Sequence, residues 1–524
     1  MHGNPHQGRF QPHLLIHGLS YDLQRPLLVL EDGSVVTAGQ FRDRISQFVQ
    51  TLARHGLAKG DRVAVLAPNR PEVLCVTAAC LIGQHVLVPL HPAGAVDDLA
   101  YAVEESEVKV LVFDPQKFTD TAARIRERVP ECVLLALGPS ALGDDLCAQA
   151  ASVQPTALVA PDVAPDEPYR LTYSGGTTGK PKAVVATQRV GAAVVAIQMA
   201  EWEWPSQIRQ LVCSPLSHAG SAMFLPTLLR GGQMVLMGTF EPVAVMQAIE
   251  KHRITCVLLV PTMIYSLLDH PRWSEFDLTS LETIFYGAAA ISPARLREGI
   301  ERLGPVFFQF YGQVEAPMSV AVLRRADHDI TKPLRLASCG RPVPWVEVAL
   351  LDDKLCEVPP ETPGEICVRG PLVMAGYLNQ PELTSEALRG GWLHTGDVAV
   401  KDADGFIRIV GRLKDMIITG GFNVYPREIE DVLSNHPDIA SCAVIGVPDA
   451  HWGEAVTAIV VLRPGAATGP DEIKAYVRAR KGPVYAPKSV EFVQAIPLTG
   501  LGKPDKKLLR KQYSSSGKTT VSAS

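Results

Sequence analysis

The first half of the chain repeats one pattern, in which short apolar stretches alternate with segments long enough to form helices. Residues 63–66, 86–90 and 108–113 have the length and composition of buried strands, and 256–260, 283–286 and 307–311 follow the same pattern. Strands separated by helices run parallel and need helices on both faces of their sheet. The pattern therefore predicts an α/β fold with parallel-rich sheets flanked by helices.

Helix signals support this prediction. Thr37 and Gln40 form a capping-box pair, and apolar residues from Phe41 onward recur at helical spacing up to Gly56. The pattern changes near residue 411, after which a compact α+β arrangement follows. Pro426 stands at the start of one helix there, 471–480 form a second, and 443–445 and 458–462 are expected strands. We expect one domain over 1–411, a boundary at 412–414, a second domain over 415–512 and a disordered tail over 513–524.

Composition excludes several classes of function. The 524 residues suggest about two to four folding units. The net charge of −5 gives no broad basic field, so a nucleic-acid partner is not expected. The ten cysteines form no Cys-x-x-Cys pair, which favours reduced thiols over zinc or redox sites. No apolar run is long enough to cross a bilayer, and Met1 to Pro12 lack a signal-peptide pattern, so a cytoplasmic protein is expected.

Residues 173–182, Tyr-Ser-Gly-Gly-Thr-Thr-Gly-Lys-Pro-Lys, carry the sharpest local signal and follow a short strand at 171–173. Glycines let a backbone approach an anion closely, hydroxyls donate hydrogen bonds, and lysines supply charge. A P-loop kinase motif is excluded, because only three residues separate Gly175 from Gly179 and Pro181 follows Lys180. The candidate phosphate-binding residues are Ser174, Gly175, Gly176, Thr177, Thr178, Gly179 and Lys180.

This segment resembles the phosphate loop of the acyl-adenylate-forming (ANL) superfamily, which includes acyl-CoA synthetases, luciferases and peptide-synthetase adenylation domains. The resemblance continues in order from about Asp32 to Arg510. It implies a large N-terminal domain with the ATP and acyl sites, and a small mobile C-terminal domain that moves about a hinge at 412–414, centred on Lys414. It also implies ATP, Mg²⁺ and coenzyme A as cofactors or substrates.

Further motifs of the family lie in the N-terminal part. Residues 215–220 resemble the segment lining the acyl site, where His218 takes the place of an aromatic residue that gates the carboxylate pocket. Residues 286–290 resemble the adenine-binding loop, with Gly287, Ala288 and Ala289. Residues 309–315 resemble the Tyr-Gly-x-Thr-Glu motif, which implies that Glu315 holds Mg²⁺. The remaining nucleotide-binding candidates in this motif are Gln309, Tyr311, Gly312 and Val314.

The remaining motifs lie around the boundary and near the C-terminus. Residues 391–397 and 411–417 resemble the segments that place Asp397 and Arg412 at the ribose. Gly420 and Gly421 belong to a segment that faces the incoming pantetheine in the family. Residues 497–503 resemble the loop that carries the adenylation lysine, here Lys503. Taken alone, each of these Gly-rich stretches is equally typical of an ordinary turn.

The chain departs from the family pattern at four positions. Gly175 replaces a usual Ser, Ala183 a usual Gly and Gln188 a common His. Val314 replaces the Thr whose hydroxyl contacts the nucleotide phosphate. A hydrogen bond to a charged oxygen contributes roughly 1.5–3 kcal/mol, so adenylation could be slowed by about one to two decades.

The resemblance implies an acyl-CoA synthetase of the fatty-acid–CoA ligase type, which acts in fatty acid metabolism. It activates a carboxylate as acyl-AMP, releases pyrophosphate and transfers the acyl group to CoA, with catalytic roles for Lys503, Glu315, Thr177 and His218. The expected acyl segments, 219–224, 286–289 and 313–318, hold no Arg or Lys, which argues against a dicarboxylate. No Asp stands beside His218, which argues against an amino acid.

A hydrophobic monocarboxylic acid follows, whether fatty, aromatic or alicyclic, and a medium or long chain is favoured. Two alternatives remain. The acceptor could be a carrier protein instead of CoA. Because of Val314, the chain could be a weakened nucleotide- or acyl-binding homologue. A luciferase-type oxygenase would share the first step, but nothing in the sequence identifies such chemistry. A homodimer is possible.

Overall fold

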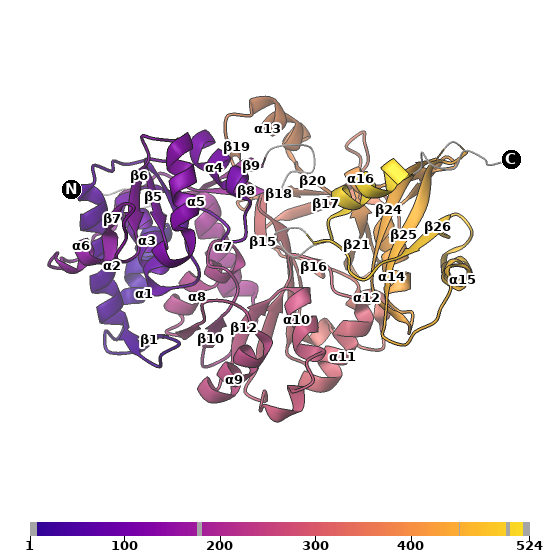
Figure 1. The fold of residues 1–524 in the computed structure, drawn as a ribbon, viewed down its shortest axis with the longest axis horizontal. Helices are drawn as coiled ribbons and strands as arrows, with labels where there is room; N and C mark the ends of the chain where they lie inside the picture. Colours follow the sequence, from indigo (N-terminus) through magenta and orange to yellow (C-terminus); the bar gives the residue numbers. More distant parts are fainter. Residues whose placement is uncertain (1–7, 175–180, 450, 499–503, 517–524) are drawn as a thin grey trace.

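The computed structural model describes residues 8–174, 181–449, 451–498 and 504–516. Two large mixed sheets form most of the molecule, and the C-terminal elements lie at the end opposite the N-terminal helices (Figure 1). The helices of the large part are α1 Gln11–Ser20, α2 Ala38–Arg54, α3 Pro71–Gly83, α4 Val96–Glu105, α5 Pro115–Arg128, α6 Leu146–Ala151, α7 Gln188–Glu201, α8 Phe224–Leu229, α9 Pro242–His252, α10 Pro261–Leu268, α11 Pro293–Leu303, α12 Pro333–Leu336 and α13 Pro381–Ala387.

The eight-stranded sheet has a parallel centre, as the alternating pattern predicts. Only its edge next to the phosphate segment is antiparallel, where β9 pairs with β8 and β19. In spatial order its strands are β19 Gly376–Tyr377, β9 Lys182–Thr187, β8 Pro168–Ser174, β4 Val86–Pro89, β3 Arg62–Leu66, β5 Val110–Phe113, β6 Val133–Ala136 and β7 Asp144–Asp145.

The nine-stranded sheet is built in the same way, with a parallel centre and antiparallel edges. In spatial order its strands are β16 Arg341–Pro342, β15 Ala316–Leu323, β14 Phe307–Gln313, β13 Thr283–Tyr286, β12 Cys256–Leu259, β10 Arg209–Val212, β11 Gln233–Leu236, β1 Pro26–Val29 and β2 Val35–Thr37.

Alternation along each strand sends neighbouring side chains into different core layers. In β3, Val63 and Val65 join a core with α1, α2, α3 and strand β11 of the other sheet, whereas Ala64 and Leu66 pack with α4 and α5. Helices α9, α10 and α11 cover one face of the nine-stranded sheet. The two sheets therefore share a layer of helices, and each is covered on its other face as well.

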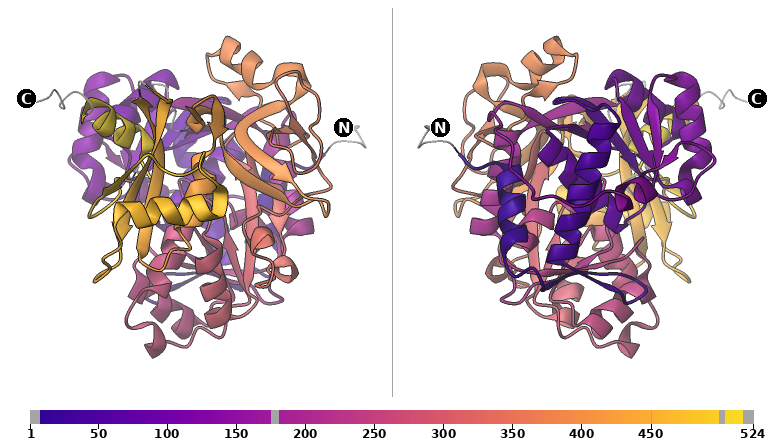
Figure 2. Two further views of the ribbon diagram at one scale, coloured as in Figure 1. Left: turned by 90° about the vertical axis from the view of Figure 1, so that its right-hand side faces the viewer. Right: turned by 90° about the vertical axis from the view of Figure 1, so that its left-hand side faces the viewer.

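Two smaller antiparallel-rich sheets follow. The four-stranded sheet is β17 Glu347–Leu351, β18 Gly364–Arg369, β20 Leu393–Lys401 and β21 Ile407–Arg412. The C-terminal sheet contains β23 Phe422–Val424, β22 Ile417–Thr419, β25 Gly453–Leu462, β24 Ile439–Asp449 and β26 Ser489–Phe492. Helices α14 Pro426–Leu433, α15 Pro470–Lys481 and α16 Lys506–Ser516 accompany it, and Figure 2 shows this group from its own side and from the opposite side.

The predicted α/β class is confirmed, and the capping box of Thr37 and Gln40 begins α2 as expected. One expectation needs correction, because the first residues of the predicted disordered tail continue α16 to Ser516. The reason is packing, since Tyr513 lies against a core of Ala443, Ile445 and Ile459. In the part of the chain that the structure describes, no helix is both long and apolar enough to cross a membrane.

Candidate active site

Asp397 and Arg412, the two residues predicted at the ribose, meet Tyr311, a further predicted nucleotide-binding residue. The hydroxyl of Tyr311 donates to Asp397 Oδ2 at 2.7 Å, and Arg412 Nε lies 2.7 Å from Asp397 Oδ1. Asp397 and Arg412 are direct register partners on β20 and β21, while Tyr311 comes from β14. The carboxylate is only 4% exposed. Residues 86 and 101 positions apart in sequence are thus joined in one bonded group by the meeting of two sheets.

Electrostatics in this group follow from burial and the shared carboxylate. Burial, and then the negative charge of Asp397, raise the pKa of Tyr311 well above its ordinary value, so its hydroxyl stays protonated and donates. Burial acts to lower the pKa of Arg412, but the attraction of Asp397 and Tyr311 outweighs it and raises the pKa. The group therefore keeps one neutral donor and one ion pair around Asp397.

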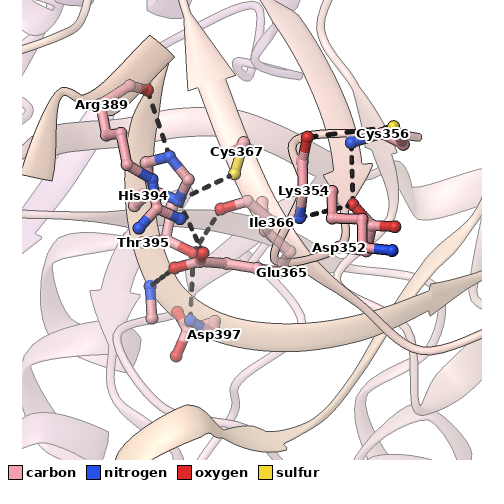
Figure 3. Close-up of polar contacts among 11 residues, drawn as sticks. Asp352, Lys354, Cys356, Glu365, Ile366, Cys367, Arg389, His394, Thr395 and Asp397 are labelled. Atoms are coloured by element: carbon pink, nitrogen blue, oxygen red, sulfur yellow. Dashed lines mark hydrogen bonds and ion pairs between the residues drawn. The ribbon is translucent and has the colours of Figure 1, made fainter. Parts of the chain in front are cut away.

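Asp397 is aimed by a bulge. The register between β18 and β20 shifts between Glu365 and Cys367, and Gly396 has φ of +70°, which favours glycine. Within the bulge, Glu365 Oε1 accepts the Gly396 N–H at 2.8 Å, and Thr395 Oγ1 donates to the Ile366 carbonyl at 2.7 Å. These bonds replace the missing ladder partners (Figure 3). Sequence reasoning missed Glu365, although it belongs to a strand facing the predicted ribose segment.

Glu365, Cys367 and His394 also have the donor types of a metal site, because their ligand atoms lie within 4.8 Å of one another. Their contacts favour a hydrogen-bonded cluster instead (Figure 3). His394 Nδ1 lies 2.7 Å from Glu365 Oε2, and its Nε2 lies 3.2 Å from the Arg389 carbonyl. Burial raises the pKa of Cys367 to about 12, so the thiolate that a metal would need is disfavoured. We assign no metal to this cluster.

Glu315, the predicted magnesium ligand, lies between β14 and β15. The hydroxyl of Tyr377 donates to Glu315 Oε1 at 2.9 Å, and the Met374 N–H donates to its backbone carbonyl at 2.8 Å. Among the described residues, Glu315 Oε2 has no hydrogen-bond partner. The ammonium of Lys182 lies 5.5 Å from the centre of the Tyr377 ring. A carboxylate with one oxygen still available suits a hard cation such as Mg²⁺.

Val314 lies beside Glu315 and is half-buried against the core of the four-stranded sheet. Its neighbour Gly312 has no room for a side chain, because a Cβ would stand 2.4 Å from the Met318 nitrogen. Met318 itself has φ of +63°, which is unusual for a residue other than glycine. Such backbone strain persists where the surrounding structure enforces it and is common at functional sites.

The predicted adenine loop directly follows β13. A Cβ on Gly287 would stand 2.5 Å from the Phe310 carbonyl oxygen, so only glycine allows this close approach to β14. Ala288 has φ of +63° and is exposed. Gln309 is buried, and its Oε1 accepts the Tyr286 hydroxyl at 3.2 Å, so its side-chain oxygen is engaged within the protein. Ala289 is half-buried.

His218 ends the loop after β10, ahead of the short helix η1 Ala219–Ser221. Its Nδ1 lies 3.0 Å from Ser217 Oγ, and its ring meets that of His91 edge-on, with centroids 4.7 Å apart. Burial, followed by His91 and Arg170, lowers the pKa of His218 to about 3. The imidazole is therefore neutral at physiological pH.

Arg170 also reaches this segment, although it belongs to β8. Its Nη2 donates to the Ser217 carbonyl at 2.7 Å, and its Nη1 lies 3.4 Å from Ser221 Oγ. The predicted acyl segments contain no Arg or Lys, as the sequence shows, but the fold brings this guanidinium from β8 against Ser221 within one of them and against Ser217 just before it.

The boundary residues lie on the surface between the parts. Lys414 lies in the short helix η5 Leu413–Asp415, and burial, followed by repulsion from Arg412, lowers its pKa. Gly420 and Gly421 form the turn between β22 and β23, with φ of +56° and +81°.

Of the predicted phosphate-binding residues, the structure describes Ser174. It ends β8, where its Oγ donates to the Lys182 carbonyl at 3.4 Å. Gly175, Gly176, Thr177, Thr178, Gly179, Lys180 and Lys503 lie outside the described residues.

Comparison with known proteins identifies the family of the chain. The model of the AMP-binding enzyme family matches residues 21–378, and that of the AMP-binding enzyme C-terminal domain matches 428–503. The chain is 48% identical over 515 residues to the medium/long-chain-fatty-acid–CoA ligase FadD8 of Mycobacterium tuberculosis, covering 96% of this chain and 90% of that protein. It is 39% identical to a feruloyl-CoA synthase of Amycolatopsis, covering 93% and 95%.

A solved structure agrees with the fold. The amide bond synthetase McbA of Marinactinospora thermotolerans superposes with a TM-score of 0.88 at 35% identity, covering 96% of this chain and 100% of that one. The family model alone covers more than half of the chain. The chain belongs to the AMP-binding enzyme family, within the acyl-adenylate-forming superfamily, and to its AMP-forming acid–thiol ligases of the acyl-CoA synthetase type.

Proposed function

We propose that this enzyme activates a hydrophobic monocarboxylic acid with ATP, as an acyl-adenylate, and transfers the acyl group to coenzyme A. The bonded group of Tyr311, Asp397 and Arg412 carries the proposal, because a buried carboxylate at a strand bulge can accept both hydrogen bonds of a ribose diol. Nucleotide binding would place the diol in competition with Tyr311, which already donates to Asp397 and marks the position of a donor.

In the first half-reaction, the substrate carboxylate attacks the α-phosphate and pyrophosphate leaves. The protein contributes position and charge, which are the main terms in phosphoryl chemistry of this kind. Glu315, with Oε2 available, would hold Mg²⁺, which would neutralise phosphate charge when bound. Thr177, Thr178 and Lys180 would bind phosphate oxygens, and Lys503 would approach the α-phosphate. His218, neutral in the folded protein, would border the reacting carboxylate without adding charge.

In the second half-reaction, we propose that residues 415–512 rotate about Lys414 as one domain, within a hinge at 412–414. The interface with the large part supports this, since it contains weak bonds such as Ser292 Oγ to Ser434 Oγ at 3.3 Å. A cavity of about 390 Å³ also lies at this interface, between Arg408 of β21 and Tyr425 and Tyr485 of the C-terminal part. An incompletely packed interface opens at low cost. Rotation would remove Lys503 and bring Gly420 and Gly421 toward the thiol.

Replacing Lys503 tests this division of labour. We expect Lys503→Ala to abolish adenylate formation but to leave thioester formation from a supplied acyl-adenylate. Equal loss of both steps would contradict the rotation. Lys507→Ala is the matched control, because Lys507 is an exposed residue of α16 outside the proposed loop.

For the substrate, we propose a fatty, aromatic or alicyclic acid, with a medium or long chain favoured. The named relatives support this range, since one is a medium/long-chain-fatty-acid–CoA ligase and another a feruloyl-CoA synthase. To test the substrate, purified protein would be incubated with MgATP and a panel of acids, with and without CoA, and the products would be identified by mass.

We propose the cytoplasm as the location. The ten cysteines are free and form no disulfide with one another, which fits a reducing compartment.

The acceptor is tested in the same experiment. An acid-dependent acyl-CoA would support the proposal, whereas adenylate that accumulates despite CoA would favour a carrier protein. One observation favours including amines, because the similar McbA structure is named an amide bond synthetase. An amide formed from the adenylate and an added amine, in preference to a thioester, would replace CoA as the proposed acceptor.

A further inference from the structure

Arg170 occupies an unusual electrostatic position between the two large sheets. Its three protein acceptors are all uncharged: Thr172 Oγ1 at 3.1 Å, Ser221 Oγ at 3.4 Å and the Ser217 carbonyl at 2.7 Å. No carboxylate of the described residues forms an ion pair with it, whereas many other arginines in this part of the chain have one. A guanidinium has five N–H donors, so two of them lack a protein partner there.

Burial makes this isolation significant. Burial is the largest influence on the pKa of Arg170 and lowers it. The guanidinium nevertheless stays charged, because arginine does not lose its proton in proteins. Buried charges in proteins are normally paired with an opposite charge, since isolating one from water is costly. The residue is half-buried, so the group is not wholly withdrawn from a ligand. An uncompensated cation in such a position fits an anionic ligand.

The neighbours of Arg170 define which ligand. The guanidinium contacts Ser217 and Ser221 on either side of His218, and the His218 ring contacts that of His91, two residues beyond the end of β4. Both imidazoles have lowered pKa values because of burial, so they add hydrogen-bonding atoms but no charge. His91 Nδ1 accepts the Ala93 N–H at 3.1 Å, which leaves its other nitrogen as a donor. One cation and two neutral rings therefore line the same place.

The position along β8 separates this place from the phosphate end. Arg170 precedes Ser174, the last residue of β8, by four residues, which is about 13 Å along a strand. Leu87 of β4 is the register partner of Arg170, so the backbone of Arg170 lies inside the sheet, and its side chain extends from there toward 217–221. The ligand is consequently better sought in the acid than in the triphosphate.

We infer that Arg170, with His91 and His218, forms a carboxylate-binding subsite of the acyl site. This inference rests on the proposed function and specifies how the acid is held. A guanidinium binds a carboxylate through charge-assisted hydrogen bonds, and two unpaired N–H groups suffice for a two-point contact. Because the proposed substrate is a monocarboxylic acid, we assign the subsite to its reacting carboxylate; a second carboxylate bound there would instead revise the proposed substrate class.

The test compares Arg170→Gln and Arg170→Lys with the unmodified enzyme, using acid-dependent pyrophosphate release. The panel pairs each simple acid with its ω-carboxy counterpart of equal length. We expect Arg170→Gln to raise KM for the acid about 10- to 100-fold, with KM for ATP unchanged. Arg170→Lys keeps the charge and should recover part of the loss. Arg189→Gln is the control, because Arg189 is exposed and pairs with Asp166.

The KM values for simple acids and for ω-carboxy acids show which carboxylate Arg170 binds. Loss with every acid identifies the reacting carboxylate, and loss confined to ω-carboxy acids identifies a second one. Unchanged KM for all acids, or a rise in KM for ATP instead, would overturn the subsite. Binding of the acid to each variant, measured by calorimetry without ATP, keeps the test valid if a variant turns over slowly. Failure of the proposed function is distinct, since the unmodified enzyme would then release no pyrophosphate with any acid.

Discussion

Removing the carboxylate of Glu365 should weaken ATP binding without weakening acid binding. Glu365 accepts Gly396 N–H at 2.8 Å and lies 2.7 Å from His394 Nδ1, so it holds the bulge that aims Asp397. Each hydrogen bond to a charged group contributes roughly 1.5–3 kcal/mol. Glu365→Ala would lose both and leave a partly buried N–H unsatisfied. We expect the bulge to be destabilised by about 3 kcal/mol. If part of this free energy is needed to order the bulge when ATP binds, KM for ATP rises by about 10- to 100-fold.

Glu365→Gln separates this positioning role from charge. The glutamine oxygen can still accept the Gly396 N–H, and its amide can donate to His394 Nδ1. We therefore expect a rise in KM for ATP of less than about fivefold. Glu347→Ala is the matched control, because Glu347 is an exposed carboxylate on the neighbouring strand β17 and pairs with Arg369.

The assay is acid-dependent pyrophosphate release, with ATP and acid varied separately. Thermal unfolding of each variant would be followed in parallel, so that loss of folded protein is not mistaken for loss of affinity. The reasoning is refuted if folded Glu365→Ala keeps its KM for ATP, or if KM for the acid rises by the same factor. Restoration by Gln, but not by Ala, is the expected signature.

Three other predictions concern single positions. Val314→Thr should speed adenylation by about 10- to 100-fold by adding a hydroxyl donor for phosphate, and an unchanged single-turnover rate would exclude that role. Gly287→Ala should cost about 1–3 kcal/mol of stability and most activity, because its Cβ would stand 2.5 Å from the Phe310 carbonyl; normal denaturation and turnover would contradict the close approach. Burial lowers the pKa of His328 to about 4, so the folded protein binds fewer protons than the unfolded chain and loses stability as pH falls from about 6.5 to about 4. His328→Gln should reduce that dependence by about 1.4 kcal/mol per pH unit in denaturant unfolding, and an equal slope would refute it.

The fold class and the motifs that carry the candidate site were recognisable from local pattern. Glycine spacing, an ordered series of motifs and the Thr37 capping box require only short-range information, because turns, caps and strand alternation depend on neighbouring residues. The α/β class and the family were confirmed for the same reason. The helical start of the tail was not predictable, because Tyr513 is ordered by contact with a core built from β24 and β25.

The sequence by itself determined the fold class, the family and the residue types offered to a nucleotide. Only the tertiary structure decided which of them meet. Asp397 is aimed by Glu365 of a neighbouring strand, and Arg170 reaches the acyl segment from the other sheet. Both effects depend on strand order and register, which bring together residues 31 and 47 positions apart that share no periodicity. Sequence periodicity indicates which face of a strand or helix a side chain lies on. Which residues of other elements contact that face is decided only by tertiary packing.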